Sequence, residues 1–142
     1  MKQEYKDWFI KNSNLNPIGR DGKNRRYTFT NINYSEVPFH DDLKQYIFSL
    51  NSITKDSNYE IYNIHTWKEG DFFTQHTDDN GTRKWSYVCE LKPSICNTKL
   101  LVNGSSIEEG LFATNLPHSV PYIQKGTRIS LTVFGLYNTM LI

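Results

Sequence analysis

The stretch that decides the fold is Gly70-Asp-Phe-Phe-Thr-Gln-His76-Thr-Asp78. A turn glycine precedes an aromatic, extended run, and that run ends in a histidine and an aspartate two residues apart. On a strand, residues i and i+2 point to the same face. The imidazole of His76 and the carboxylate of Asp78 therefore converge on one point, which could be a metal ion. Two protein ligands hold a metal poorly, so we look for a third elsewhere in the chain.

The composition is that of one globular domain. The chain has 142 residues, enough for one hydrophobic core, and 14% of them are aromatic, which favours strands. A net charge of +1 gives no electrostatic reason to expect nucleic acid or an anionic membrane as the main partner. No apolar run approaches the ~20 residues of a membrane span, and the N-terminus lacks the apolar core of a secretory signal. We therefore expect a soluble, cytoplasmic protein whose Cys89 and Cys96 stay reduced.

Short extended segments separated by tight turns dominate from residue 58 onward. Asn80-Gly81 and Asn103-Gly104 are interpreted as turns. The strands expected here are 59–67, 72–76, 84–91, 99–102, 105–107, 111–114 and 127–136. This pattern predicts a mainly β fold, a jelly roll or double-stranded β-helix, with supporting helices on its outside.

The upstream part of the chain is predicted to support that core. We expect helices over 1–12 and from Pro38 to Leu50, an exposed loop over 13–26, and a strand over 27–32. The whole chain, 1–142, is interpreted as one domain. Residues 1–57 form its helical and loop support, and residues 58–138 form the jelly-roll core.

The third ligand is predicted to be His118, which lies between Pro117 and Pro121. Two imidazoles and one carboxylate on one face of an octahedral ion leave three positions open, as in non-haem Fe(II) oxygenases. Arg128 follows ten residues later and Ser130 two beyond it, so both face one way on a strand. A guanidinium beside a hydroxyl suits a carboxylate ligand. Taken singly, each of these residues has a structural alternative: a polar turn, a loop histidine or a surface charge.

At this point a resemblance can be named. The segment from Ile64 to Leu136 resembles the 2-oxoglutarate- and Fe(II)-dependent dioxygenases, particularly the prolyl 4-hydroxylase-like branch. Gly70 to Asp78 is similar to that branch's ligand-bearing strand, with the turn glycine six residues before the first ligand. Glu109 to Ser130 resembles its distal segment, including the ten-residue step from histidine to arginine.

The resemblance implies a role for each matched residue. His76, Asp78 and His118 would bind Fe(II), while Arg128, assisted by Ser130, would hold the distal carboxylate of the cosubstrate 2-oxoglutarate. The implied reaction decarboxylates 2-oxoglutarate to succinate and hydroxylates an unactivated C–H bond, in a prolyl or another amino-acid residue of a peptide or protein. The resemblance also admits ascorbate as an auxiliary reductant.

Two positions depart from the family pattern. The family often has tyrosine three residues before the turn glycine, where this chain has Trp67, whose indole N–H could donate to the cosubstrate instead. The family's Gly-Gly before the hairpin strand is replaced by Cys96-Asn-Thr-Lys-Leu-Leu101. Asp79 is an alternative carboxylate, but as the neighbour of Asp78 it would point the other way on a strand.

Two other kinds of function remain open from sequence. One is a non-enzymatic, cupin-like jelly-roll module that binds a metal or a small molecule, since this architecture hosts many functions. The other is a hydrolase with a zinc-like His/Asp/His site, which leaves Arg128 and Ser130 without a role.

Overall fold

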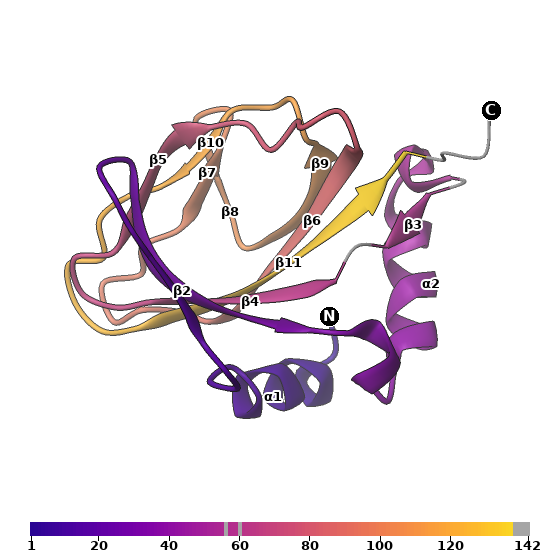
Figure 1. Cartoon of the computed structure of the whole chain (residues 1–142), viewed down its shortest axis with the longest axis horizontal. Helices are drawn as coiled ribbons and strands as arrows, with labels where there is room; N and C mark the ends of the chain where they lie inside the picture. Colours follow the sequence, from indigo (N-terminus) through magenta and orange to yellow (C-terminus); the bar gives the residue numbers. More distant parts are fainter. Residues whose placement is uncertain (56, 60, 138–142) are drawn as a thin grey trace.

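One antiparallel sheet that curls round on itself forms most of the protein (Figure 1). The computed structural model describes residues 1–55, 57–59 and 61–137. Its strands are β1 (Ile18–Asp21), β2 (Arg25–Ile32), β3 (Asn58–Tyr59), β4 (Tyr62–Trp67), β5 (Phe72–His76), β6 (Arg83–Lys92), β7 (Leu100–Val102), β8 (Ser105–Ile107), β9 (Glu109–Ala113), β10 (His118–Val120) and β11 (Arg128–Leu136). The helices are α1 (Gln3–Lys11) and α2 (His40–Leu50), with 3-10 turns at Tyr34–Glu36 and Ser52–Thr54.

The strand order explains how the sheet closes. Hydrogen-bonded neighbours follow the order β8-β7-β10-β5-β2-β4-β11-β6-β9, with β1 added beside β2 and β3 beside β11. Curling brings β5, β7, β8 and β10 to face the half built from β4, β11 and β6 (Figure 1). The predicted jelly roll is therefore confirmed. Glu60, inside a predicted strand, and Asn138, at the end of the predicted core, lie outside the described residues.

Residues of β11 and β4 alternate between two environments. In β11, odd-numbered residues from 129 to 133 join the core cluster that α1 and α2 complete, whereas even-numbered residues from 128 to 134 line an internal cavity. In β4, residues 62 and 64 join the same helical core, and residues 63, 65 and 67 line the cavity. The two-residue period of a strand thus assigns one face to packing and the other to a site.

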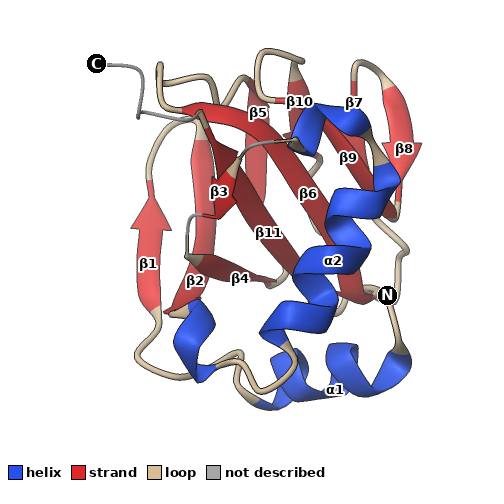
Figure 2. Cartoon of the chain, turned by 90° about the vertical axis from the view of Figure 1, so that its right-hand side faces the viewer, coloured by secondary structure: helices blue, strands red, loops and turns tan. Residues whose placement is uncertain are grey.

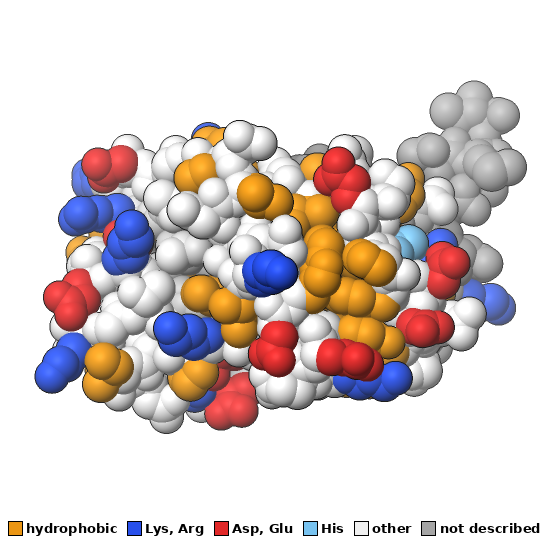
Figure 3. Space-filling view, turned by 90° about the horizontal axis from the view of Figure 1, so that it is seen from below, with side chains coloured by type: hydrophobic (Ala, Val, Ile, Leu, Met, Phe, Trp, Pro, Cys, Tyr) orange, Lys and Arg blue, Asp and Glu red, His pale blue; other side chains and the backbone are white. Residues whose placement is uncertain are grey.

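Both helices pack on the outer face of the sheet (Figure 2). Leu43 and Ile47 of α2 are fully buried, and Phe9 of α1 is as well, so the two helices expected from apolar spacing are present. Tyr46 and Leu50 remain exposed. The face seen from below carries a gathering of hydrophobic side chains among charged ones (Figure 3). None of the described helices is long and apolar enough to cross a membrane.

The exposed loop predicted over residues 13–26 is wrong in its second half. β1 and β2 form an antiparallel hairpin there, with Ile18 opposite Phe29 and Asp21 opposite Arg26. Every residue of β1 is exposed, so the strand carries no alternation of buried and exposed residues that a sequence pattern could reveal. β2 also pairs with β4 and β5, which makes part of the upstream segment a central element of the sheet.

Asn-Gly pairs close two turns, as predicted. Asn103 and Gly104 between β7 and β8 both have positive φ, 49° and 84°, as a type I′ hairpin requires. At the other turn Gly81 has a φ of 85°, and the side-chain oxygen of Asn80 accepts hydrogen bonds from the backbone N–H groups of Thr82 and Arg83.

Replacing Gly135 by alanine is expected to destabilise the fold by about 2 kcal/mol or more, because buried side chains resist overpacking. Gly135 lies opposite Trp85 on β6, and an added Cβ would stand 1.8 Å from an indole carbon of that fully buried ring. Gly19→Ala is the matched control, since nothing lies within 4 Å of its Cβ. Urea unfolding measures both variants, and equal stabilities would contradict this account of the Gly135–Trp85 contact.

Candidate active site

Three side chains that are distant in sequence meet at one end of the barrel. Ligand atoms of His76, Asp78 and His118 all lie within 4.8 Å of one another. The Nε2 atom of His118 is 2.8 Å from one carboxylate oxygen of Asp78, and the Nε2 atom of His76 is 3.6 Å from the other. The spacing of these atoms suits a metal ion held between them.

Strand pairing brings the two histidines together. His76 on β5 is the direct cross-strand partner of His118 on β10, and their ring centroids are 4.2 Å apart. β5 ends at His76, so Asp78 lies beyond the strand rather than on it. A backbone hydrogen bond of 3.0 Å from the Asp78 N–H to the carbonyl of Thr114 fixes its place. His76 and Asp78 converge as expected. The position of the Asp78 carboxylate is set by a loop contact, however, and not by the alternation of side chains along a strand.

The protonation of both imidazoles follows from their backbone partners. The Nδ1 atom of His76 is 2.7 Å from the carbonyl oxygen of Thr74, and Nδ1 of His118 is 3.0 Å from that of Leu116. A carbonyl only accepts, so each Nδ1 must carry the hydrogen, and in the neutral ring Nε2 keeps its lone pair. In this neutral form both lone pairs face the point shared with Asp78, which is how metal-binding histidines are usually oriented. In the metal-free form a proton on Nε2 of His118 bonds to Asp78 instead.

Asp78 and His118 stabilise one another's charged forms. Burial alone would raise the pKa of Asp78, but the hydrogen bond and the charge of His118 outweigh it and lower that pKa. Burial alone would lower the pKa of His118, and the bond to Asp78 raises it instead. Burial lowers the pKa of His76. A cation placed among these groups would replace the proton they share, so the donor set fits a divalent metal.

Asp79 does not join this group. It is exposed, and its side-chain oxygen accepts a hydrogen bond of 3.1 Å from the N–H of Gly81, inside the turn that precedes β6. The alternative carboxylate from the sequence therefore belongs to a turn.

A cavity of about 230 Å³ opens beside the His/Asp/His group. Its wall combines aromatic rings with polar side chains from β2, β4, β6 and β11, while β5 and the following loop supply His76 and Asp78. The residues that line it include Arg20, Arg25, Tyr27, Phe29, His65, Trp67, Phe73, Arg83, Arg128, Ser130 and Phe134.

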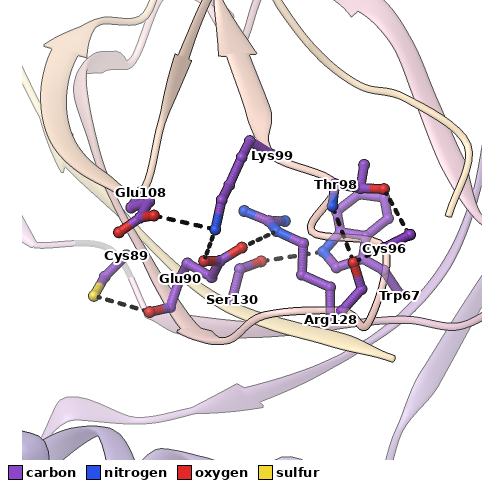
Figure 4. A network of polar contacts seen from close by, with 10 residues as sticks. Trp67, Cys89, Glu90, Cys96, Thr98, Lys99, Glu108, Arg128 and Ser130 are labelled. Carbon is purple, nitrogen blue, oxygen red and sulfur yellow. Dashed lines mark hydrogen bonds and ion pairs between the residues drawn. The ribbon is translucent and has the colours of Figure 1, made fainter. Parts of the chain in front are cut away.

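Arg128 lines this cavity and is held by a buried polar network (Figure 4). Its side chain is 3% exposed, and its Nε donates to Glu90 at 3.2 Å. The other oxygen of Glu90 accepts from the ammonium of Lys99 at 2.6 Å, and Lys99 also pairs with Glu108 at 3.2 Å. Because that hydrogen bond of Arg128 uses Nε, the two terminal amino groups of the guanidinium are left for a ligand in the cavity.

Trp67 and Ser130 are hydrogen-bonded to each other across β4 and β11. The indole N–H of Trp67 donates to the hydroxyl oxygen of Ser130 at 3.1 Å (Figure 4). Both side chains are buried and both line the cavity. Since the hydroxyl accepts from the indole, its own hydrogen is free to be donated elsewhere. Trp67 therefore acts on the cavity through Ser130 as well as by its ring.

Sequence reasoning missed two groups of this site, the buried carboxylate of Glu90 and the imidazole of His65. Glu90 interrupts an apolar strand, and an acid there signals a buried partner, here Arg128. His65 precedes Trp67 by two residues and so shares its face on β4. Its Nδ1 is buried and has no hydrogen-bond partner among the described residues, and burial lowers its pKa to about 4. A neutral imidazole thus faces the same cavity.

Comparison with known proteins finds matches among solved structures, but none among family models or curated sequences. No protein-family model matches the sequence, and no curated protein sequence matches it. A prolyl-4-hydroxylase from Pseudomonas putida superimposes with a TM-score of 0.73 at 12% identity, over 97% of this chain and 89% of that one. The 2-oxoglutarate complex of a viral collagen prolyl hydroxylase from Paramecium Bursaria Chlorella virus-1 gives 0.68 at 15% identity, over 97% and 92%.

A more distant match has the same architecture. An oxidoreductase of the 2OG-Fe(II) oxygenase family from Burkholderia pseudomallei gives a TM-score of 0.61 at 12% identity, over 92% of this chain and 76% of that one. The fold of this chain is therefore the one that 2-oxoglutarate- and Fe(II)-dependent oxygenases use. Within that class, the similar structures include prolyl hydroxylases.

Proposed function

We propose that this protein is an Fe(II)- and 2-oxoglutarate-dependent oxygenase that hydroxylates an unactivated C–H bond. The observation that carries the proposal is the convergence of His76, Asp78 and His118, with both Nε2 lone pairs turned toward the carboxylate. Such a facial set of ligands leaves three positions open on an octahedral ion. The bound iron would supply the activation of dioxygen, and the protein supplies ligation, orientation and a protected cavity.

The cavity offers a binding site for the cosubstrate. Arg128 would bind the distal carboxylate of 2-oxoglutarate through its two terminal amino groups, as a fork suited to a planar anion. Glu90 fixes the plane of that guanidinium through Nε. Ser130 would add a hydroxyl donor to the same carboxylate, with Trp67 holding the hydroxyl oxygen in place.

The aromatic wall would exclude water from the reacting atoms. The ring of Phe73 stacks on His76 with centroids 3.5 Å apart, and Tyr27 stacks on Phe73 at 5.6 Å. These rings limit the motion of the imidazole and present an apolar surface to the substrate carbon. We propose a prolyl residue, or another amino-acid residue of a peptide or protein, as the target. The likeness of the fold to prolyl hydroxylases supports this choice.

Succinate formation tests the proposal. Purified protein with added Fe(II) is expected to convert 2-oxoglutarate to succinate, and His76→Ala is expected to lose that turnover. Equal succinate from the two proteins would refute it. Mass spectrometry of products with +16 Da from incubated cell extract then identifies the substrate and the reaction together.

Removing the Ser130 hydroxyl is expected to raise the KM for 2-oxoglutarate about fivefold, the value of one ordinary hydrogen bond. Trp67→Phe is expected to cause a similar rise, because it frees the hydroxyl that the indole N–H now orients. Since both changes disrupt the same hydrogen bond between Trp67 and Ser130, the KM of the double variant should be no higher than that of Ser130→Ala. Steady-state kinetics of the three variants measure this, and multiplicative losses would show that Trp67 contacts the cosubstrate independently.

A further inference from the structure

Three arginines surround the open side of the cavity. Arg20 of β1, Arg25 of β2 and Arg83 of β6 all line it, together with the deeper Arg128. Arg20 and Arg25 are exposed, whereas the aromatic lining residues Tyr27 and Trp67 are buried. The β1–β2 hairpin therefore forms the mouth of the cavity, and its cationic side chains lie where a substrate would enter.

Each of these guanidinium groups lies over an aromatic ring of the cavity wall. The Cζ atom of Arg20 is 4.9 Å from the centre of the Phe29 ring, that of Arg25 is 5.9 Å from Phe73, and that of Arg83 is 3.9 Å from Phe134. Stacking restrains a guanidinium, and at Arg20 and Arg25 it leaves the in-plane N–H donors available to an anion. A set of freely solvated surface charges would not share this arrangement.

The mouth is close to the metal-binding group. Arg25 is the cross-strand partner of Phe73, whose ring stacks directly on His76. Arg83 begins the strand that follows the Asp78 loop, and both Arg83 and Asp78 line the cavity. An anionic group bound at the mouth would thus lie within a few side-chain lengths of the carbon presented to the metal.

Two positive charges at the mouth, those of Arg20 and Arg25, are not balanced by a carboxylate of the described residues. Asp78 is the carboxylate among the lining residues, and it is committed to the histidines and the metal. The ion pairs of the described residues include no partner for Arg20 or Arg25. Arg26, between them in the hairpin, points away and pairs with Asp71 at 3.4 Å. With the two carboxylates of 2-oxoglutarate assigned to Arg128 and the metal, the charges of Arg20 and Arg25 are left for another ligand.

We propose that Arg20 and Arg25 bind a carboxylate of the substrate, so that the enzyme selects an acidic peptide in which Asp or Glu flanks the target residue. This inference rests on the proposed function. Arginine recognises a carboxylate by a charge-assisted fork, and a ring of arginines at a cavity mouth also attracts anionic substrates from solution.

Peptide retention tests the substrate class without turnover. Three pools of short amidated peptides carry a randomised central residue flanked by Glu, Gln or Lys, and are passed over immobilised protein loaded with Mn(II) and 2-oxoglutarate. Mass spectrometry quantifies the retained peptides. At low salt we expect the Glu pool to be retained about tenfold better than the Gln pool, and the Lys pool least. The preference should shrink at ~1 M salt, where charges are screened within about 3 Å.

The variants Arg25→Glu and Arg20→Glu are expected to remove the preference for the Glu pool, with retention of the Gln pool as the internal measure of folded protein. Lys23→Glu is the matched control, because Lys23 lies at the tip of the same hairpin, is exposed and does not line the cavity. It makes the same change of charge and should keep the preference. N-acetylproline and N-acetylprolinamide are then each added as competitors of the Glu pool. Stronger competition by N-acetylproline would show that a free small acid occupies the same site as a peptide side chain.

Equal retention of the Glu and Gln pools by the wild type would overturn the inference, as would the same loss in Lys23→Glu and Arg25→Glu. These outcomes are separate from failure of the proposed function. Retention requires no oxidation, so a protein that retains acidic peptides but forms no succinate refutes the function and keeps the anion site. A protein that forms succinate but retains the Glu and Gln pools equally keeps the proposed function and refutes the anion site.

Discussion

Asp78→Asn is expected to weaken the binding of Mn(II), used as a stand-in for Fe(II), by about 100-fold. The change keeps the shape of the side chain and removes the negative charge that faces both imidazoles. At a metal concentration 100 times the wild-type Kd, the wild type gains about 2.7 kcal/mol of stability, whereas a 100-fold weaker variant gains about 0.4 kcal/mol. Thermal unfolding with and without Mn(II) measures the difference.

Asp79→Asn is the matched control for that experiment, with the same change of charge at the next residue. Its side-chain oxygen, which caps the turn at Gly81, is retained in asparagine. Because the metal-free forms are the reference for each protein, any loss of the Asp78–His118 contact itself is subtracted. A stabilisation by Mn(II) that persists in Asp78→Asn but is lost in Asp79→Asn would place the metal on the other carboxylate.

Much of the fold could be predicted because its strands are amphipathic. The alternation in β4 and β11 reports a helical core on one side and a cavity on the other, and the Asn-Gly pairs mark the turns. β1 was not predicted as a strand because all four of its residues are exposed. Its pairing with β2 therefore produces no alternation of apolar and polar residues in the sequence. An exposed edge strand of this kind is specified mainly by backbone hydrogen bonds, which nearly every residue type can make.

The candidate site likewise contains residues that the sequence could predict and residues that it could not. His76, Asp78 and His118 could be proposed from spacing, since His and carboxylate are the ligands of a non-haem Fe(II) site and the three residues lie in or beside predicted strands. Glu90 and His65 could not, because their roles depend on partners supplied by other strands. Ser130 lies opposite both Glu90 on β6 and His65 on β4, a neighbourhood that no local pattern contains.

Arg128→Met is expected to weaken 2-oxoglutarate binding by about 30-fold or more, the effect of removing one side of a buried, hydrogen-bonded charge pair. The variant also leaves Glu90 buried without the guanidinium. Breaking a buried ion pair typically costs about 3–5 kcal/mol. We expect a smaller loss here, because the ammonium of Lys99 remains 2.6 Å from the other oxygen of Glu90.

The double variant Arg128→Met/Glu90→Gln separates the two effects. It removes the uncompensated acid and is expected to recover part of the stability lost in Arg128→Met, because a buried neutral pair carries a lower desolvation cost than a lone charge. It cannot restore the fork that would bind the cosubstrate carboxylate, so 2-oxoglutarate affinity should stay as low as in Arg128→Met. Urea unfolding and anaerobic titration of Mn(II)-loaded protein with 2-oxoglutarate measure the two properties independently. Recovery of affinity along with stability would mean that Arg128 shapes the cavity and that another cation holds the cosubstrate, with Arg20 and Arg25 as candidates among the residues that line the cavity.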